Sequence, residues 1–383
     1  MNRYKYLFRI LFLLVIFVIL LMGCTSPAPS EIKIGLIAPL SGEYADSTGQ
    51  PAVDAVQMAV DEVNEAGGLE INGRRYTIVL ITKDNQGNPE TSVSAAQQLI
   101  NQEGVVAIIG PMFSSNAIPV SEIAEQAGIP MISPTSTNPQ TTLGKTFVFR
   151  ATFIDDFQGL AMARFALEDL GLQKAAVLYD VASSYNRGLA ETFRDAFKRL
   201  GGDVVAFESY TTDTNSDFSK QLTRIQETNA QALFLPNYTD DVLRKGEQAQ
   251  AMGLNVTFLG SDSWEGERLM GLPAFENSFF SGHFCRDLSV ARIRTFSETY
   301  EQRYGREPNG LISLSYDSAG LLFAAMQNQN QATPATIRDG LFAINYTGIT
   351  GPISYDTNGD PMKSVAIWTI EKNTRGCYKM VTP

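Results

Sequence analysis

Histidine, cysteine and basic residues are all scarce in this chain of 383 residues. The only histidine, His283, leaves no basis for a histidine-dependent catalytic triad or a histidine-rich metal site. The 30 Lys and Arg residues are outnumbered by 41 Asp and Glu residues, whereas nucleic-acid binding requires a basic face. The sequence therefore predicts a protein that is not an enzyme and that uses no metal, no cofactor and no nucleic-acid partner.

Two cysteines, Cys285 and Cys377, lie in the body of the chain. An exported protein meets oxidising surroundings, in which a disulfide between these two thiols is one possibility. Two separately buried thiols are the other, and the sequence leaves both open.

The one long apolar run is at the start of the chain. Thirteen apolar residues, 10–22, follow the cations Arg3, Lys5 and Arg9. This run is short for a membrane span and has the length of a signal-peptide core. We therefore expect a signal peptide at residues 1–23, with an uncleaved membrane anchor as the alternative.

The segment L-M-G-C at residues 21–24 resembles a bacterial lipobox. The resemblance implies cleavage before Cys24 and lipidation of this residue, and a doubly anchored terminus holds a protein stably at a bilayer. Residues 24–31, rich in Pro, Ser and Ala, would then form a lipidated tether at the periplasmic or outer face of the cell membrane. Without residues 1–23, the chain has 27 Lys and Arg against 41 Asp and Glu, a net charge of −14.

Strand and helix patterns alternate over residues 31–259. Short β-branched runs predict parallel strands, and apolar residues at helical spacing predict the helices between them. The first series has expected strands at 32–40, 76–81, 105–109, 129–133 and 147–151. A second series has expected strands at 175–179, 204–207, 232–235 and 256–259. Two such series predict an α/β fold with two doubly wound parallel sheets and right-handed crossovers.

The pattern changes after Ser278. An extended run is followed by three expected helices without strands between them, at 290–304, 311–327 and 334–342. Such helices must cover a sheet that already exists, and the simplest arrangement returns them to the first lobe. A final β segment is expected at 351–355 and 365–370. The predicted first lobe is therefore 32–152 plus 284–348, and the predicted second lobe is 153–283 plus 349–383.

Residues 110–139 carry the central pattern of the first lobe. The pattern predicts a strand, a loop, a helix, a second strand and a second loop, in this order. Ser114 and Ser115 stand where the helix begins, and Ser136 and Thr137 stand in the second loop. The carboxyl ends of adjacent parallel strands meet at one sheet edge, so these two hydroxyl-rich loops come together. Free N–H groups and the helix dipole suit a small anion there. Ordinary helix capping by the serines is the alternative.

The second lobe offers an acid and aromatic rings at the ends of its expected strands, namely Tyr185, Tyr238 and Asp262. A glycine-bounded loop after the first strand adds Tyr44 and Thr48. A zwitterion with an apolar body fits between the lobes, with its carboxylate toward the hydroxyl-rich loops and its ammonium toward Asp262. Interdomain packing is the alternative for Tyr238, and a helix cap is the alternative for Asp262.

Five segments appear in order along residues 110–360: G-P-M-F-S-S, M-I-S-P-T-S-T-N-P, S-Y-N-R-G-L, G-S-D-S-W and Y-D-T-N-G-D. Together they resemble the branched-chain amino acid-binding proteins of ABC importers, which are type I periplasmic binding proteins. The resemblance covers nearly all of residues 31–360. It implies two lobes joined by three crossovers, which close on a ligand by a hinge motion. It also implies a monomer that captures an amino acid, with leucine, isoleucine or valine as leading candidates, for an ABC permease and its ATPase.

The same resemblance assigns roles to residues. It implies that Ser114 and Thr137 bind the ligand carboxylate and that Ser136 supplies a backbone contact. It implies that Tyr185 is a pocket aromatic residue and that Asp262 binds the α-ammonium group. The expected ligand-binding residues are Ser114, Ser115, Ser136, Thr137, Tyr185, Tyr238, Asp262 and Thr48.

Two positions depart from the family. The loop after Ser41 is one residue longer than in leucine-binding members, which brings Thr48 roughly to the place of an aromatic residue. Phe113 replaces a cysteine that forms a disulfide in some members. The family also includes amide, urea and aromatic-acid binders, so the side chain of the ligand stays open. A lipoprotein that senses an amino acid or amide and signals to a membrane receptor is the alternative function.

Three further features have simple interpretations. Gly144-Lys145-Thr146 imitates the end of a phosphate loop, but Pro139 stands in place of its first glycine. The acidic segment 356–360 is too short for a full set of calcium ligands, and a turn is expected there. We expect His283, in the run that returns to the first lobe, to be a structural residue near the hinge.

Overall fold

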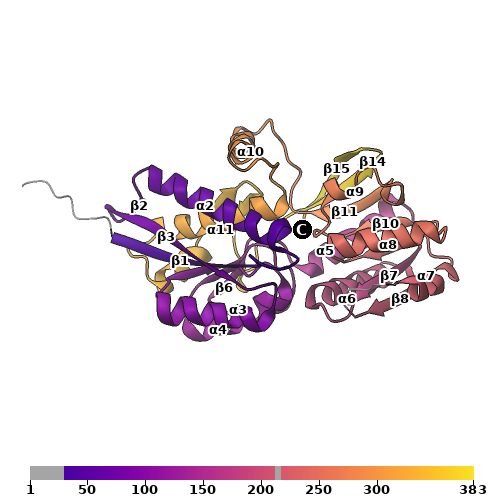
Figure 1. Ribbon diagram of the computed structural model, residues 1–383, viewed down its shortest axis with the longest axis horizontal. Coiled ribbons are helices and arrows are strands. Elements are labelled where there is room, and N and C mark those ends of the chain that lie inside the picture. Colours follow the sequence, from indigo (N-terminus) through magenta and orange to yellow (C-terminus); the bar gives the residue numbers. More distant parts are fainter. Residues whose placement is uncertain (1–29, 212–216) are drawn as a thin grey trace, which may run out of the picture.

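The structure is a computed structural model that describes residues 30–211 and 217–383. The expected signal peptide, the expected lipidation site Cys24 and most of the expected tether lie outside these residues. The described chain forms two lobes that lie side by side, each with helices on both faces of one sheet (Figure 1). This arrangement confirms the predicted two-lobed α/β fold.

The first lobe has a six-stranded sheet of order β2-β3-β1-β4-β5-β6, parallel except for β2. Its strands are β1 Ser30–Ala38, β2 Leu69–Ile71, β3 Arg74–Asp84, β4 Ala107–Ile109, β5 Met131–Ser133 and β6 Val148–Arg150. Its first helices are α2 Gln50–Glu65, α3 Pro89–Gln98 and α4 Ser114–Ala127. Because β1 begins at Ser30, the last two residues of the expected tether belong to the sheet. Strand β2 is absent from the expected strands because three residues are too few to show a period.

The second lobe has a seven-stranded sheet of order β15-β14-β11-β10-β9-β7-β8, in which β14 and β15 are antiparallel. Its strands are β7 Lys174–Asp180, β8 Asp203–Tyr210, β9 Ala232–Leu235, β10 Thr257–Gly260, β11 Ser278–Gly282, β14 Val365–Glu371 and β15 Thr374–Val381. Its helices are α5 Asp155–Arg164, α6 Ser184–Arg199, α7 Ser219–Gln226, α8 Thr239–Ala251 and α9 Gly266–Leu269. The edge strand β15 is not among the expected strands, because few of its side chains are apolar and none is fully buried.

The chain then returns to the first lobe, as the lack of strands between the later helices predicts. The returning elements are α10 Ala291–Tyr304, α11 Gly310–Gln327, α12 Pro334–Phe342, β12 Tyr346–Gly348 and β13 Gly351–Ile353. Leu322 and Met326 of α11 are fully buried in one core with Ile34 and Leu36 of β1. The opposite face of the same sheet has its own core, formed with α3 and α4.

Three segments cross between the lobes, at 151–154, 283–290 and 354–364. The expected division between residues 348 and 349 falls inside the antiparallel pair of β12 and β13. Ile353 at the end of this pair packs in the first-lobe core, whereas Val365 packs in the second-lobe core. We therefore propose that the chain leaves the first lobe after Ile353, later than the sequence pattern indicates.

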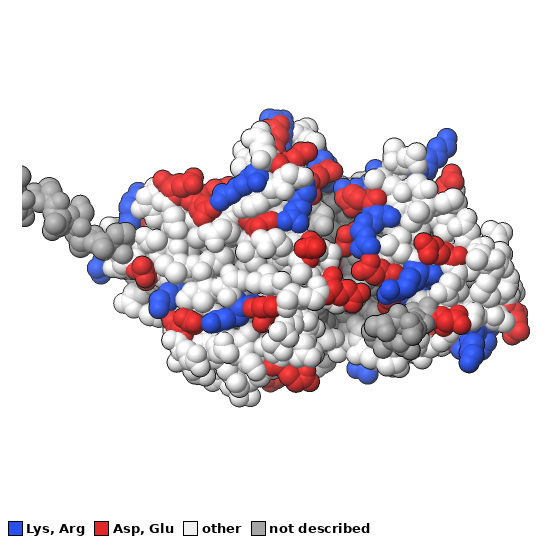
Figure 2. Space-filling model, viewed as in Figure 1, with Lys and Arg blue, Asp and Glu red and all other residues white. Residues whose placement is uncertain are grey.

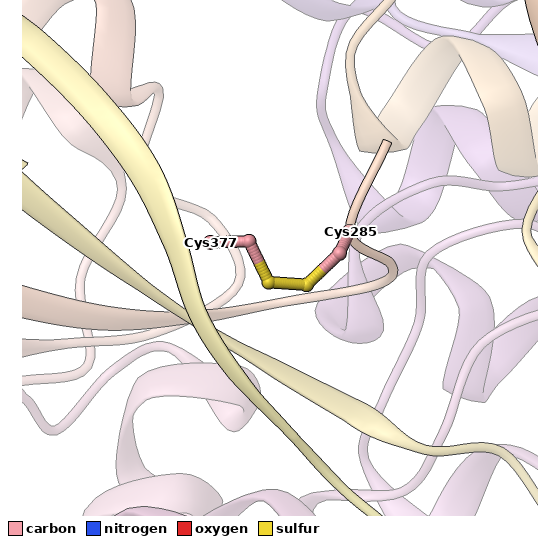
Figure 3. The surroundings of a disulfide bond; sticks show 2 residues. All are labelled: Cys285 and Cys377. Carbon is pink, nitrogen blue, oxygen red and sulfur yellow. A yellow bond between two sulfur atoms is a disulfide. The ribbon is translucent and has the colours of Figure 1, made fainter. Parts of the chain in front are cut away.

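A disulfide joins Cys285 of the second crossover to Cys377 of β15 (Figure 3). The two Cα atoms are 5.6 Å apart, which is within the usual range for this bond. Of the two alternatives left open by the sequence, the structure therefore shows the disulfide. The bond ties the start of a crossover to the edge of the second sheet.

Charged side chains of both signs are interspersed on the face drawn in Figure 2, which shows no broad basic patch among the described residues. Within residues 30–211 and 217–383, no helix combines the length and the apolarity that crossing a bilayer requires. The same residues contain no group of three or more His, Cys, Asp or Glu side chains arranged to hold a metal ion.

Candidate ligand-binding site

A cavity of about 170 Å³ lies between the lobes, at the carboxyl ends of strands from both sheets. The first lobe contributes Tyr44, Thr48, Met112, Phe113, Ser114 and Leu311 to its wall. The second lobe and its crossover contribute Tyr185, Tyr238, Asp262, Ser263, Ser281 and His283. This volume is below the roughly 300–1,000 Å³ of drug-sized pockets, so the cavity suits a small molecule.

Helix α4 begins at the cavity wall without a side-chain cap. Phe113 occupies its N-cap position in an extended conformation, and none of the described side chains accepts a capping hydrogen bond there. The serines at the helix start therefore do not act as ordinary caps. The N–H groups of Asn116 and Ala117 donate to the Phe113 carbonyl oxygen. Those of Ser114 and Ser115, with the positive end of the helix dipole, are left for another acceptor.

A short series of hydroxyl groups stands behind Ser114. The Ser136 hydroxyl donates to Ser114 Oγ at 3.0 Å, and Ser136 Oγ lies 2.7 Å from Thr141 Oγ1. Because Ser114 accepts from Ser136, its own proton is free to be donated into the cavity. This end of the cavity therefore presents several donors to an anion.

Arg150 holds the loop that carries these hydroxyls, although it does not reach the cavity. Its fully buried guanidinium donates to the carbonyl oxygens of Ser136 (2.6 Å) and Asn138 (3.0 Å). It also donates to Thr142 Oγ1 and to Asp360 Oδ1, each at 2.6 Å. Asp360 ends the expected turn, whose other acid, Asp356, accepts from main-chain N–H groups within the turn. The turn therefore serves as the counterion of Arg150.

Asp262 forms the opposite end of the cavity. Its Oδ1 accepts from Tyr185 Oη at 2.5 Å and from Gln158 Nε2 at 2.7 Å, and its Oδ2 lies 3.2 Å from His283 Nε2. Burial and the nearby carboxylate raise the pKa of Tyr185 well above its ordinary value, so the phenol stays a donor. Asp262 is thus an oriented acid rather than a helix cap.

A second acid, Asp155, lies behind the cavity at the start of α5. Its N–H donates to the carbonyl oxygen of Thr137 at 2.9 Å. Burial, reinforced by the charge of Asp262 and opposed by the nearby Thr137 hydroxyl and Arg150, raises the pKa of Asp155 to about 8. Asp155 is therefore protonated at neutral pH, and Asp262 is the acid that faces the cavity.

Aromatic rings from both lobes close one side of the cavity. The ring of Phe113 lies 4.8 Å from that of Tyr44 and 5.1 Å from that of Tyr238. The ring of Tyr238 also lies 5.4 Å from that of Tyr185. Burial raises the pKa of Tyr44 to about 12, so this phenol is neutral. The wall is therefore largely apolar, as an apolar ligand body requires.

The lobes also touch directly beside the cavity. Asn138 Nδ2 of the first lobe donates to the Ser184 carbonyl oxygen of the second at 2.9 Å. The Ser184 N–H donates in return to Ser115 Oγ at 3.3 Å. These contacts hold the loop after β5 and the start of α4 against the start of α6.

Five of the expected ligand-binding residues line the cavity: Thr48, Ser114, Tyr185, Tyr238 and Asp262. Ser115, Ser136 and Thr137 are not part of its wall, and their direct contact with a ligand stays a prediction. Ser115 contacts the other lobe, Ser136 supports Ser114, and Thr137 is fully buried near Asp155. The expected residues therefore differ in what they contact: some line the cavity and others support it from behind.

The wall also contains residues outside the expected ligand-binding set, among them Tyr44, Phe113 and His283. Tyr44 lies in the same loop as Thr48, and Phe113 directly precedes Ser114. Both follow the carboxyl end of a parallel strand, where ligands bind in such sheets, so this rule could have identified them. His283 follows the carboxyl end of β11, where the same rule applies. The structure places it near the hinge, as expected, and also beside Asp262, which the sequence does not reveal.

The model of the family described as periplasmic binding protein matches residues 31–375 of this chain. The chain belongs to the type I periplasmic binding proteins. An amino acid binding protein of Pseudomonas aeruginosa is 29% identical to this periplasmic binding protein over 343 residues, which cover 88% of this chain and 90% of the relative.

Two solved structures extend the comparison. A leucine binding protein, LivK, of Thermotoga maritima has a TM-score of 0.83 and 30% identity, and the match covers 92% of this periplasmic binding protein and 99% of LivK. The branched-chain amino acid transporter substrate binding protein LivJ of Streptococcus pneumoniae, in complex with isoleucine, has a TM-score of 0.81 and 29% identity, with 92% and 100% covered.

Proposed function

We propose that this periplasmic binding protein captures an amino acid between its lobes and delivers it to an ABC permease. One observation carries the proposal. An uncapped helix start with the Ser114 hydroxyl stands on one lobe, and the Asp262 carboxylate stands on the other, across a single cavity. An α-carboxylate and an α-ammonium group complement these two ends, and charged hydrogen bonds contribute about 1.5–3 kcal/mol each.

The side wall supports an apolar ligand body. Tyr44, Phe113 and Tyr238 present rings, and Met112 and Leu311 add aliphatic surface. The matches to a relative named as leucine binding, and to one solved in complex with isoleucine, each cover 92% of this chain. Leucine, isoleucine and valine are therefore the first candidates.

We expect the two lobes to close on the ligand because each lobe supplies one part of the site. A ligand that bridges Ser114 and Asp262 contacts both lobes, and it therefore favours the closed arrangement by its differential contacts. The closed pair of lobes would then be the form that the permease and its ATPase receive. Capture and release need no bond-making chemistry, so the proposed role is transport and not catalysis.

The proposal includes export and a lipid on Cys24, carried by the lipobox at residues 21–24. Strand β1 begins at the end of the first lobe that lies away from the second lobe (Figure 1). An anchor attached there leaves the cleft free to open. The protein would act as an extracytoplasmic monomer held at the membrane.

A thermal-shift screen of the protein amino acids, short amides and urea tests the proposal, followed by calorimetry with the best ligand. Asp262→Asn keeps the shape of the side chain and removes its charge, so we expect affinity to fall at least about tenfold, or 1.4 kcal/mol. The matched control is Asp195→Asn on the outer side of α6, where the carboxylate is 63% exposed. We expect it to bind as the parent protein does.

Two results would contradict the proposal. One is a folded protein whose melting temperature no amino acid raises. The other is an Asp262→Asn variant that binds the selected amino acid with unchanged affinity, which would remove Asp262 from the site.

A further inference from the structure

His283 stands where three parts of the molecule meet. It opens the second crossover, and its ring stacks on Phe153 of the first crossover with ring centroids 4.8 Å apart. On the first lobe, a methyl group added at Gly310 would come 2.7 Å from Cδ2 of the ring, so the start of α11 packs closely on it. The residue is only 6% exposed and lines the cavity. These contacts fix the position of the ring. Because the ring lines the cavity, a change in its charge alters the electrostatics of the site.

The two ring nitrogens have different partners. Nε2 lies 3.2 Å from Asp262 Oδ2, and Nδ1 lies 3.2 Å from Thr152 Oγ1. A carboxylate oxygen only accepts, so Nε2 carries a proton and donates it. In the neutral ring, Nδ1 then accepts from the Thr152 hydroxyl. The neutral form therefore orients Asp262 and leaves its negative charge in place.

Asp262 keeps room for one more donor. Each carboxylate oxygen accepts about two hydrogen bonds. Oδ1 already accepts from Tyr185 and Gln158, whereas Oδ2 faces only His283 among the described contacts. The remaining position on Oδ2 is available to a cationic group of a guest while His283 is neutral.

The other charged groups near this pair do not compete for that role. Asp155 on α5 is protonated below pH 7, because its pKa is raised to about 8. Tyr185 on α6 and Tyr238 before α8 are neutral phenols, whose pKa values burial raises. The remaining charged side chains of the cavity wall lie in ion pairs, namely Arg286 with Glu307, Arg375 with Glu267, Asp240 with Arg268 and Glu265 with Arg268.

Resting on the function proposed above, we propose that His283 is a specificity-determining residue that acts through Asp262. When neutral, it positions Asp262 and leaves the negative charge to the ammonium group of an amino acid. When doubly protonated, it takes that charge for itself. The site then loses its preference for amino acids over carboxylic acids of the same shape that lack the amino group.

The single histidine makes a direct test simple, because an untagged protein has one imidazole to observe by NMR. By linkage, a ligand that prefers the neutral ring of His283 must favour loss of the second ring proton when it binds. We expect saturating leucine to shift the titration midpoint to lower pH by at least about half a unit. A midpoint that leucine leaves unchanged or raises would overturn the proposal.

Calorimetry with a matched pair of ligands gives the second test. Leucine and 4-methylpentanoate share the carboxylate and the side chain, and only leucine has the ammonium group. Between pH 7 and pH 5.5, the range in which histidine commonly titrates, we expect the ratio of their affinities to fall at least about threefold. His283→Gln keeps a neutral donor for Asp262 and cannot gain a proton, so its ratio should not change with pH.

The outcomes separate the two proposals. Leucine binding with equal pH dependence in both proteins, or with none, overturns the role of His283 and leaves the capture of amino acids standing. A folded protein that binds no amino acid between pH 5.5 and 7 removes both. Thermal unfolding checks that His283→Gln is folded, and if it is not, the NMR titration of the parent protein decides alone.

Discussion

Replacing Arg150 by methionine tests how the site is supported. Arg150 is fully buried and makes four hydrogen bonds, two of them to main-chain oxygens of the loop that carries Ser136. Removing one partner of a buried ion pair typically costs about 3–5 kcal/mol. The Asp360 side chain is 15% exposed and regains some water. We therefore expect a loss of about 3 kcal/mol in the free energy of unfolding.

The assay is urea unfolding followed by circular dichroism, with the shift of the midpoint multiplied by the measured slope. The matched control is Arg164→Met on α5, which breaks an exposed pair with Glu168 at 3.7 Å. Such a surface pair is worth about 0.3–0.5 kcal/mol. Asp360→Asn, alone and combined with Arg150→Met, completes a double-mutant cycle with an expected coupling of about 0.5–3 kcal/mol.

Ligand binding supplies the second readout. Arg150 does not touch the cavity, but its acceptors include the carbonyl oxygens of Ser136 and Asn138. Loss of these bonds should loosen the hydroxyl series behind Ser114 and lower the affinity for the amino acid. The reasoning is refuted if Arg150→Met unfolds at the same urea concentration as Arg164→Met and binds ligand unchanged.

Two further predictions concern stability. Burial raises the pKa of Asp155 from 3.8 to about 8, so the native state holds a proton that the unfolded chain releases, and stability falls as pH rises between about 4 and 8. Asp155→Asn should therefore raise the melting temperature more at pH 8 than at pH 5, and equal changes would contradict this. Cys285→Ser opens a disulfide that spans 92 residues, which is worth at most about 4–5 kcal/mol by loop entropy. We expect a lower melting temperature without reductant and no further fall when reductant is added, whereas a parent protein insensitive to reductant would argue against the bond.

Local patterns were sufficient for the architecture. Short runs rich in apolar and β-branched residues marked most of the parallel strands, because a strand buried on both faces must be largely apolar. The helix after the loop was expected to begin at Ser114 and Ser115, and α4 begins at Ser114. Ser114 and Asp262 were placed at opposite ends of one site, because the ends of parallel strands are functional edges in such folds.

Local sequence patterns could not show in which direction each side chain points. Ser114 and Ser115 are adjacent in sequence, yet successive helical residues point about 100° apart, and only Ser114 lines the cavity. Ser136 and Thr137 lie in the expected loop, but its path turns their hydroxyls toward Ser114 and Asp155. Ile353 of the antiparallel pair β12–β13 likewise packs in the first-lobe core, which no local period reveals.

The order of residues along this chain was enough to predict two wound sheets and an export signal, because each depends on neighbours within a few positions. Contacts between distant residues came only from the folded molecule. Arg150 meets Asp360, His283 meets Asp262 across two strand ends, and Cys285 meets Cys377. Such pairs depend on how the crossovers bring the two lobes together, and that path has no signature in any single stretch of sequence.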